Sequence, residues 1–530
     1  MSLLSISNLN LSIRQKPILR DVSLSVDTGQ IVGIIGESGS GKSMTAYCVT
    51  QLLPEGLEPS GDIRFNGRDI LQTSEADMCA IRGAEVSMVF QEPMTALNPV
   101  QTIGQQVAET ILIHEPETTK AAALERARDA LNRVELHEDR FPLSRYPHEM
   151  SGGQRQRVVI AMAIALRPKL LIADEPTTAL DVTTQAEILS LLTRLVREDG
   201  MGLMIITHDL AVVADMADHI HIMQKGQIVE HGPADRLFQT MQHPYSKALL
   251  AASSHVPERE QPQGETPLLE VRNVLRDYPL PRTKLFAKPE SFRAVNDVSF
   301  TIRKGESLGL VGESGCGKST LTRAILGLEE IQGGEILLSG EPVFTGKKPN
   351  RAVRRKMQVV FQDPYGSFNP RHRVDRLITE PFHLLDSAPS DREDRIAEAL
   401  RSVGLTPDDA FKYPHEFSGG QRQRIAIARA LIIKPELIIL DEAVSALDVS
   451  IRAQILDLLA ELSESHGLTY LFISHDLSVV RSITDRVLVM QHGKIVEQGE
   501  TQSVFDNPTD IYTQTLIAAA PRLPEDLRNF

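Results

Sequence analysis

The sequence is poor in the residues that would support a disulfide scaffold or a membrane span. It has no tryptophan and three cysteines in 530 residues. Cys48, Cys79 and Cys316 are too few and too scattered for a disulfide framework or a zinc site, as is usual in a reducing cytosol. The longest apolar run, 158–166, has nine residues, against the roughly 20 of a membrane-spanning helix. We expect a cytosolic chain without membrane spans, and its N-terminal residues do not resemble a secretory signal.

The charge balance also excludes a class of function. Lysine and arginine number 56 and aspartate and glutamate 70, so the net charge is −14. An acidic chain is a poor partner for the phosphate backbone of DNA or RNA, and we expect no nucleic-acid partner. The length exceeds the usual ceiling of a single core and predicts two domains of roughly 250 residues each.

What the sequence does contain is one set of motifs, present twice. Two glycine-rich loops, Gly36–Ser43 and Gly312–Ser319, both fit G-x-x-x-x-G-K-[ST]. Each follows an apolar run that predicts a strand, 31–35 and 308–311. The backbone N–H groups of such a loop close around phosphates, its lysine neutralises their charge, and its serine is placed to ligate Mg²⁺. The pattern predicts binding and hydrolysis of a nucleoside triphosphate.

Spacing shows that the two sets arose by duplication. Lys42 and Lys318 lie 276 residues apart, whereas the equivalent Ser151 and Ser418 lie 267 apart. The second copy is therefore shorter before the Ser-Gly-Gly-Gln segment and stays in register after it. We predict a first domain at 1–252, a polar, proline-rich linker at 253–267, and a second domain at 268–530.

Carboxylates and histidines follow later strands in both copies. Asp174-Glu175 and Asp441-Glu442 end apolar strands, where the side chains of a parallel sheet face a ligand crevice. The aspartates should hold Mg²⁺, and the glutamates can polarise the attacking water as general bases. Histidines 208 and 475 each lie 34 residues after the aspartate, where an imidazole can hydrogen-bond a γ-phosphate. A solvated acidic turn and a structural histidine are the simpler alternatives.

Two further motifs complete each set. Gln91 and Gln362 have amides that can hold Mg²⁺ and water, although the residues alone are also compatible with plain turns. Ser151–Gln154 and Ser418–Gln421 predict a second cradle of backbone amides that opens a helix, from residues 155 and 422 onward. Since each domain already has its own phosphate loop, this cradle predicts a head-to-tail pair of domains. The composite sites would join Lys42 to Ser418 and Lys318 to Ser151.

The remaining pattern indicates an α/β fold. Residues 118–136 and 391–403 have helical spacing and good helix formers. Residues 170–173 and 437–440 are typical of buried parallel strands, and strands that alternate with helices imply an α/β sheet.

The full combination resembles the ABC ATPases over essentially the whole chain. It includes Ala-Leu-Asp at 179–181 and 446–448. The resemblance implies two tandem P-loop ABC ATPase domains, each with a RecA-like core, an antiparallel β subdomain and a helical subdomain. It implies head-to-tail closure on two ATP, with Mg²⁺, and gives both glutamines a role in transmission to a partner. The nucleotide contacts it implies are Gly36, Ser38, Gly39, Gly41, Lys42, Ser43, Met44, Gln91, Ser151, Gly152, Gly153, Gln154, Asp181, Tyr278, Gly312, Ser314, Gly315, Gly317, Lys318, Ser319, Thr320, Gln362, Ser418, Gly419, Gly420, Gln421 and Asp448.

A narrower resemblance is to the peptide/nickel branch of ABC importers. It rests on residues 91–99 and 362–370, on Tyr-Pro-His-Glu before each Ser-Gly-Gly-Gln, and on 243–250 and 512–516. A fused pair of this length is similar to the Yej-type ATPases of oligopeptide and microcin C importers; the glutathione importer's ATPase is also fused. The branch implies two integral membrane permeases, a periplasmic or extracellular substrate-binding protein, and a peripheral position on the cytoplasmic face of the inner membrane. Membrane contact would come through these partners only.

Three departures from the branch carry expectations. No cysteines cluster near the C-terminal segments, so we expect no iron–sulfur cluster. The adenine-stacking aromatic matches Tyr278 in the second half but Ile13 in the first, which predicts weaker base recognition there. Ala443 replaces the proline found at Pro176, and we expect little effect on chemistry.

Other readings of the motifs remain open at this point. A soluble tandem ABC protein on ribosomes shares the ATP motifs, but typically has a long charged helical linker. Glutathione, dipeptide, opine and nickel stay open as cargo beside oligopeptides, because nothing in this chain would contact the cargo.

Overall fold

The structure is a computed structural model. It describes residues 2–91, 96–178, 180–259, 264–280, 290–346, 348–387, 389–445, 447–521 and 523; of residues 364 and 365 the backbone alone is described.

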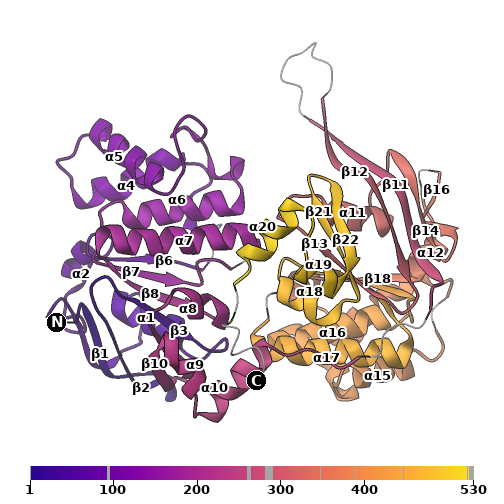
Figure 1. Ribbon diagram of the computed structural model, residues 1–530. Coiled ribbons are helices and arrows are strands. Elements are labelled where there is room, and N and C mark those ends of the chain that lie inside the picture. The colour runs from indigo at the N-terminus through magenta and orange to yellow at the C-terminus, as the bar shows by residue number, and fades with distance from the viewer. Residues whose placement is uncertain are drawn as a thin grey trace.

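The first half builds two sheets (Figure 1). The antiparallel one has the order β2 (Lys16–Val26), β1 (Leu4–Ile13), β4 (Ser60–Phe65), β5 (Arg68–Asp69). The larger one has the order β10 (Gln227–Pro233), β9 (His219–Gln224), β3 (Ile31–Ile35), β8 (Gly202–Thr207), β7 (Leu170–Asp174), β6 (Val86–Val89). Its strands are parallel except β10 at one edge. All five residues of β3 are buried, as expected for a parallel strand covered on both faces.

The second half repeats this arrangement. Its antiparallel sheet has the order β12 (Ser291–Arg303), β11 (Pro267–Pro279), β14 (Gly333–Leu338), β15 (Glu341–Pro342). The larger sheet has the order β18 (Met357–Phe361), β19 (Leu437–Asp441), β20 (Thr469–Ile473), β13 (Ser307–Val311), β21 (Arg486–Gln491), β22 (Lys494–Glu500). A hairpin of β16 (Phe344–Thr345) and β17 (Lys348–Pro349) is added. The α/β prediction is confirmed in both halves.

Helices cover the large sheets. Those of the first half are α1 (Lys42–Thr50), α2 (Glu75–Ile81), α4 (Ile103–His114), α5 (Lys120–Arg133), α6 (Gly152–Ile164), α7 (Val182–Asp199), α8 (Leu210–Met216), α9 (Ala234–Thr240) and α10 (Pro244–Ser253), with the 3-10 turn η1 (Pro147–Glu149). Those of the second are α11 (Lys318–Ile325), α12 (Arg351–Arg355), α13 (Pro364–Ser367), α14 (Val374–Ile378), α15 (Arg392–Ser402), α16 (Gly419–Leu431), α17 (Val449–His466), α18 (Leu477–Ile483), α19 (Thr501–Asp506) and α20 (Ile511–Ala519), with η2 (Glu380–Leu384), η3 (Pro407–Phe411) and η4 (Pro414–Glu416).

The predicted helices at 118–136 and 391–403 are α5 and α15. The helix α5 begins after Thr119, whose side chain accepts a hydrogen bond from the Ala122 N–H and so caps the first turn. The offset between the copies falls in this helical region. The 12-residue α4 of the first half is replaced by the five-residue α14 and a 3-10 turn in the second, which shortens the second copy.

Each half ends in a helix that packs on the other half. The helix α10 contacts α17, and α20 contacts α7; Figure 1 shows α20 beside α7. The packing is apolar: Val449 of α17 joins the core cluster of the first half, and Val182 of α7 joins a cluster of the second. These two valines are 267 residues apart, so the exchange is symmetric.

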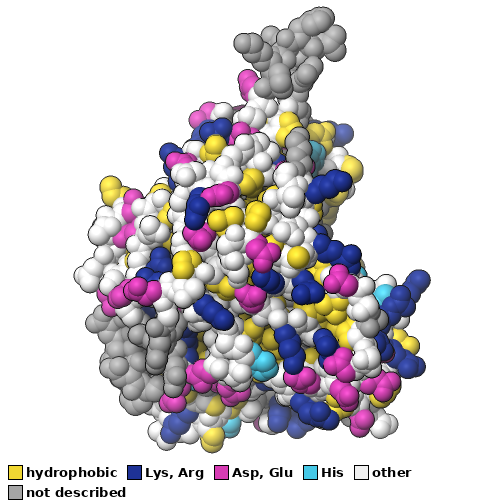
Figure 2. All heavy atoms as spheres, turned by 90° about the vertical axis from the view of Figure 1, so that its right-hand side faces the viewer, with side chains coloured by type: hydrophobic (Ala, Val, Ile, Leu, Met, Phe, Trp, Pro, Cys, Tyr) yellow, Lys and Arg dark blue, Asp and Glu magenta, His cyan; other side chains and the backbone are white. Residues whose placement is uncertain are grey.

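The connection between the halves lies against the second half. His255 Nε2 is 2.5 Å from Asp457 Oδ1 of α17, and Arg259 Nη2 is 2.6 Å from Asp485 Oδ2. Residues 260–263 lie outside the described residues. No helix within the described part of the chain combines the length and the apolarity of a membrane span. Figure 2 shows acidic and basic side chains intermingled on the exposed face of the second half.

Candidate functional site

The two phosphate loops join β3 to α1 and β13 to α11. At the first glycine of each loop a side chain is excluded: Gly36 has φ 153°, and a Cβ there would lie 2.2 Å from the Met223 carbonyl oxygen. Gly312 has the same relation to Met490. The loop therefore passes close to β9 or β21, which fixes the direction of its following N–H groups.

The two loop lysines are buried and fold back onto their own loops. Lys42 Nζ donates to the carbonyls of Gly36 and Glu37 at 2.8 and 3.1 Å. Lys318 Nζ donates to Gly312 and Glu313 at 2.6 and 2.9 Å. Burial lowers the pKa of Lys42, although the nearby carboxylates Glu175, Asp448, Asp174 and Glu37 oppose that shift. A phosphate chain in the loop would offer both ammonium groups charged acceptors in place of carbonyls.

Ser43 and Asp174 meet at the end of β7. The Ser43 hydroxyl hydrogen-bonds Asp174, whose other oxygen, Oδ1, is buried without a partner among the described residues. Burial raises the pKa of Asp174 against the effect of Ser43, and burial does the same to Asp441 in the second half. A hydroxyl beside an orphaned carboxylate oxygen fits a hard cation such as Mg²⁺, which takes oxygen ligands.

Glu175 is held by three side chains. Gln91 Nε2 and Thr178 Oγ1 each donate to Glu175 Oε2 at 2.9 Å, and His208 Nδ1 lies 3.5 Å from Oε1. Burial raises the pKa of this carboxyl, but the hydrogen bond and charge of His208 outweigh burial and leave the pKa lowered. The same opposition, with Glu175 as the dominant favourable partner, leaves the pKa of His208 raised. The predicted glutamine, glutamate and histidine therefore form one cluster.

The second site has the same residues with fewer ties. Glu442 Oε1 lies 3.4 Å from His475 Nδ1, and here too burial is outweighed by the histidine, so that the pKa of Glu442 is lowered. Ser445, the counterpart of Thr178, donates instead to the Glu442 main-chain oxygen at 2.8 Å. An open cleft of about 660 Å³ brings the predicted residues together. Its lining includes Ser319, Gln362, Asp441 and Glu442.

Both glutamates have a strained backbone. Glu175 has φ 48° and Glu442 φ 53°, in the left-handed region, which costs a residue other than glycine on the order of 1–3 kcal/mol. The main-chain N–H groups of Glu175 and Glu442 donate to Ile206 and Ile473 at 2.8 Å. These hydrogen bonds to the neighbouring strand hold the turn that aims each carboxylate at the crevice.

The Ser-Gly-Gly-Gln segments are helix starts closed by their own side chains. Ser151 Oγ accepts from the Gln154 N–H at 3.3 Å, and Gln154 Oε1 accepts from the Ser151 N–H at 3.0 Å. Ser418 and Gln421 form the same capping box. The helices α6 and α16 thus begin at Gly152 and Gly419, three residues before the predicted starts at 155 and 422. The capping box draws the glycines into the first turn.

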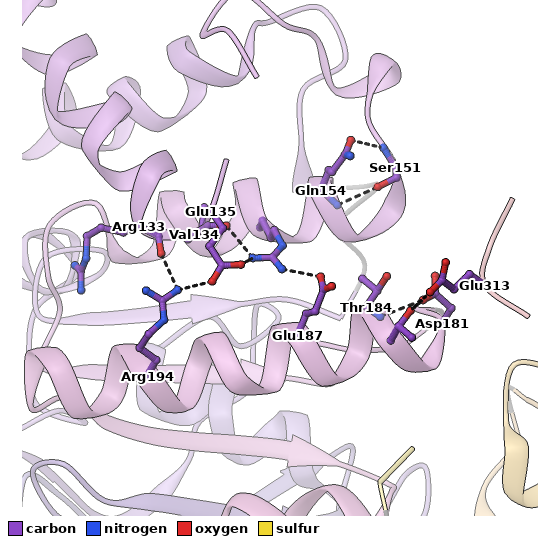
Figure 3. Close-up of polar contacts among 12 residues, drawn as sticks. Arg133, Val134, Glu135, Ser151, Gln154, Asp181, Thr184, Glu187, Arg194 and Glu313 are labelled. Carbon is purple, nitrogen blue, oxygen red and sulfur yellow. Dashed lines mark hydrogen bonds and ion pairs between the residues drawn. The ribbon is translucent and has the colours of Figure 1, made fainter. Parts of the chain in front are cut away.

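The glycines in these starts allow close helix packing. A Cβ at Gly153 would lie 2.2 Å from Thr184 Cγ2 of α7, and one at Gly420 would lie 2.6 Å from Ile451 Cγ2 of α17. Figure 3 shows how α6 is fixed beyond this point. Arg157 reaches Val134 and Glu135 after α5, at 3.0 and 2.8 Å, and Glu187 of α7 at 2.8 Å. The segment is therefore held by helices on both sides.

Each phosphate loop meets an aspartate of the other half. Asp448 Oδ1 accepts from the Ser38 N–H at 2.7 Å, and Asp181 Oδ2 accepts from the Ser314 N–H at 3.4 Å. Thr183 Oγ1 also donates to Glu313 Oε1 at 2.9 Å, next to Asp181 in Figure 3. Asp181 keeps its cap on α7 through the Thr184 N–H, whereas Asp448 makes no side-chain cap on α17. The halves therefore face each other head to tail. Ala179, Ala446 and residues 92–95, which belong to the predicted motifs, lie outside the described residues.

Comparison with known proteins agrees with this geometry. A family model described as "ABC transporter" matches residues 19–178 and 295–445, and one described as "Oligopeptide/dipeptide transporter, C-terminal region" matches 229–276 and 496–530. The chain belongs to the ABC transporter family. It is an ATP-binding subunit of the oligopeptide/dipeptide importer type, an ATPase whose hydrolysis is coupled to transport.

The most similar relatives match along almost the whole chain. "Glutathione import ATP-binding protein GsiA" of Escherichia coli O157:H7 is 46% identical over 561 residues, which cover 98% of this chain and 90% of the relative. The GsiA proteins of Escherichia coli strain K12 and Shigella flexneri match equally well. Among solved structures, a dimer of the ATP-binding cassette MJ0796 bound to ADP and Pi is 28% identical, with a TM-score of 0.39, over 44% of this chain and 99% of that chain.

The C-terminal region of the ABC importer family contains two residues whose role the motifs do not predict. Tyr245 of α10 accepts a hydrogen bond from the Glu37 N–H at 3.1 Å, and Tyr512 of α20 accepts one from the Glu313 N–H at 2.9 Å. Each tyrosine therefore ties its own phosphate loop to a helix that packs on the other half. The repeated aromatic in 243–250 and 512–516 was the available signal, but it gives no partner.

The aromatic predicted to stack on adenine lies beside its loop. The Tyr278 hydroxyl contacts Glu329 and lies 3.4 Å from Thr320 Oγ1, while the Arg276 guanidinium is 4.5 Å from the ring centroid. Ile13, the counterpart in the first half, is 37% exposed. Met44 and Thr320 lie, half-buried, in the first turns of α1 and α11.

Proposed function

We propose that this chain is the energy-coupling ATPase of a small-peptide importer and closes on two ATP at composite sites. The observation that carries the proposal is the reciprocal pair of contacts between the halves, Ser38 with Asp448 and Ser314 with Asp181. In the first site the Lys42 loop would be completed by Ser418 of the second half. In the second site the Lys318 loop would be completed by Ser151.

The residues within each site have distinct roles in this proposal. Glu175 and Glu442 act as general bases toward water, and their lowered pKa keeps them ionised at neutral pH. His208 and His475 orient these carboxylates and hydrogen-bond the γ-phosphate. The residues that would hold Mg²⁺ are Ser43, Gln91 and Asp174 in the first site and Ser319, Gln362 and Asp441 in the second. Mg²⁺ would supply neutralisation of phosphate charge.

The proposed partners are two integral membrane permeases and an external substrate-binding protein, with the chain on the cytoplasmic face of the inner membrane. The region between β6 and α6, and its counterpart between β18 and α16, would contact the permeases. We place the domain boundaries at 1–252 and 268–530, which is supported by the end of α10 at Ser253 and the start of β11 at Pro267.

The proposed cargo is a short peptide. The match to the oligopeptide/dipeptide C-terminal region supports the class. Glutathione, a tripeptide, is the second candidate, because relatives at 46% identity are named for its import. Purifying the chain from native membranes with its permeases and binding protein, and measuring which of oligopeptides and glutathione that binding protein retains, separates the two.

Removal of both general bases tests the catalytic proposal. The variant carrying Glu175→Gln and Glu442→Gln should bind ATP as the parent does, while ATP hydrolysis falls by at least about 100-fold and peptide uptake by cells that express it as their sole copy is lost. Glu55→Gln, at an exposed loop residue, serves as the control and should leave both unchanged. Substantial uptake by the double variant would defeat the proposal.

A further inference from the structure

Three histidines of the first half meet on two neighbouring strands. His219 and His221 are two residues apart on β9 and so point to the same face of the sheet. His231 of β10 is paired with His221 in the antiparallel register. One ring nitrogen from each lies within 4.8 Å of the others, and this is the only such group of three or more metal-ligating residues found among the described residues.

The geometry of the three rings suits a shared ligand. His219 Nε2 and His231 Nδ1 are 3.4 Å apart, and two nitrogens bound to a tetrahedral zinc ion at about 2.0–2.1 Å would be separated by about 3.3–3.4 Å. His221 is 4% exposed, and its Nδ1 has no hydrogen-bond partner in the described part of the chain. Buried polar nitrogens are ordinarily paired, so this atom lacks a ligand.

The second half lacks this cluster although its strands are in the same register. Arg486, Leu488 and Gln498 occupy the positions 267 residues after the three histidines, and Leu488 pairs with Gln498 as His221 pairs with His231. Both halves nevertheless carry the complete set of ATP motifs. The histidines are therefore not required by the ATPase fold and call for a separate explanation.

We propose that His219, His221 and His231 bind a divalent transition-metal ion of the zinc class. Neutral imidazole suits Zn²⁺, Co²⁺, Ni²⁺ and Cu²⁺, while Mg²⁺ and Ca²⁺ prefer oxygen. Three histidines leave a fourth position for water. The ion can enter from solvent, because His231 is exposed and His219 half-buried.

The position of the cluster gives the ion a structural role. It would cross-link β9 to β10, and this hairpin supports the first phosphate loop from behind. The Gly226 N–H in the hairpin turn donates to the Ser40 carbonyl at 2.8 Å. The Met223 carbonyl of β9 occupies the space that a side chain at Gly36 would need. Since the ion binds the folded hairpin, zinc should raise the melting temperature of the chain.

The experiment is a titration of tag-free, nucleotide-free full chain with Zn²⁺ by calorimetry, repeated with Co²⁺ to record its visible absorption. His231→Gln and His221→Leu install the residues of the second half at these positions. We expect one strongly bound Zn²⁺ per chain, a tetrahedral Co²⁺ spectrum, and affinity weakened by at least about 10-fold in each variant, since loss of even an outer partner costs that much. His137→Gln, at an exposed histidine elsewhere, should bind as the parent does.

Two results would overturn the proposal. Absence of stoichiometric Zn²⁺ binding would show that His219 and His231 are merely hydrogen-bonded to each other. Tight binding that persists in both variants would place the ion elsewhere, for example at His208 and Glu175. His231→Gln changes an exposed side chain, so its melting temperature without metal and its ATP affinity should match those of the parent and exclude misfolding as the cause.

Discussion

The hydroxyl of Tyr512 offers a direct test of how the C-terminal helix supports a phosphate loop. It accepts a hydrogen bond from the Glu313 N–H at 2.9 Å, and Tyr512 is 9% exposed. Tyr512→Phe keeps the ring and its packing but leaves this loop amide without its acceptor. A neutral hydrogen bond contributes about 1 kcal/mol net, and more if the freed group stays dry. Glu313 is half-buried, so water can reach the amide and the lower value applies.

About 1 kcal/mol corresponds to a fivefold change in an equilibrium constant. We therefore expect ATP affinity at the second site to fall about fivefold, with the first site unchanged. Titration with a fluorescent ATP analogue, in the variant lacking both general bases, measures the two affinities without turnover. Tyr245→Phe should affect the first site instead.

Ile511→Ala on the same helix provides the matched control, because Ile511 is 80% exposed. It should leave both affinities unchanged. Equal losses at both sites in Tyr512→Phe, or no loss at either, would refute the idea that this hydroxyl arranges its own loop.

Two further predictions concern the first site. Ile13→Tyr should tighten ATP binding there by about fivefold, since a stacked aromatic ring adds about 1 kcal/mol; an unchanged affinity by the same titration would contradict the stacking argument. The raised pKa of His208 means that its stabilisation is fully present below its unfolded pKa of about 6.5 and is lost as pH rises through the higher folded value. His208→Gln should thus lower the melting temperature more at pH 6 than at pH 9, and an equal loss at both would show that the charge of His208 contributes nothing.

The local chemistry of the sites was predictable because it resides in short motifs. Loop glycines, the terminal Asp-Glu of a buried strand and a histidine after the next strand all lie within one α/β unit. Parallel pairing then brings strand ends to one edge. The α5 and α15 helices were predictable for a similar reason: their helix formers and caps lie within the segment.

Other features depend on contacts between distant segments. The start of α6 at Gly152 follows from a capping box that the glycines obscure. The strained φ of Glu175 depends on the hydrogen bond of its N–H to β8. The histidine cluster needs the register of β9 and β10, because residues 221 and 231 become neighbours only when the hairpin forms. Nothing local in α10 or α20 indicates which surface covers it.

The exchange of α10 and α20 has a consequence for how this duplicated gene product can vary. A substitution on α17 changes the surface that α10 meets, and α10 carries the tyrosine of the first loop; α7 and α20 are related in the same way. Recombination that joined the first half of this chain to the second half of another fused ATPase would mismatch both pairs at once. The two halves are therefore free to diverge in sequence only in step, and a chimera should function only when both helix pairs are transferred together.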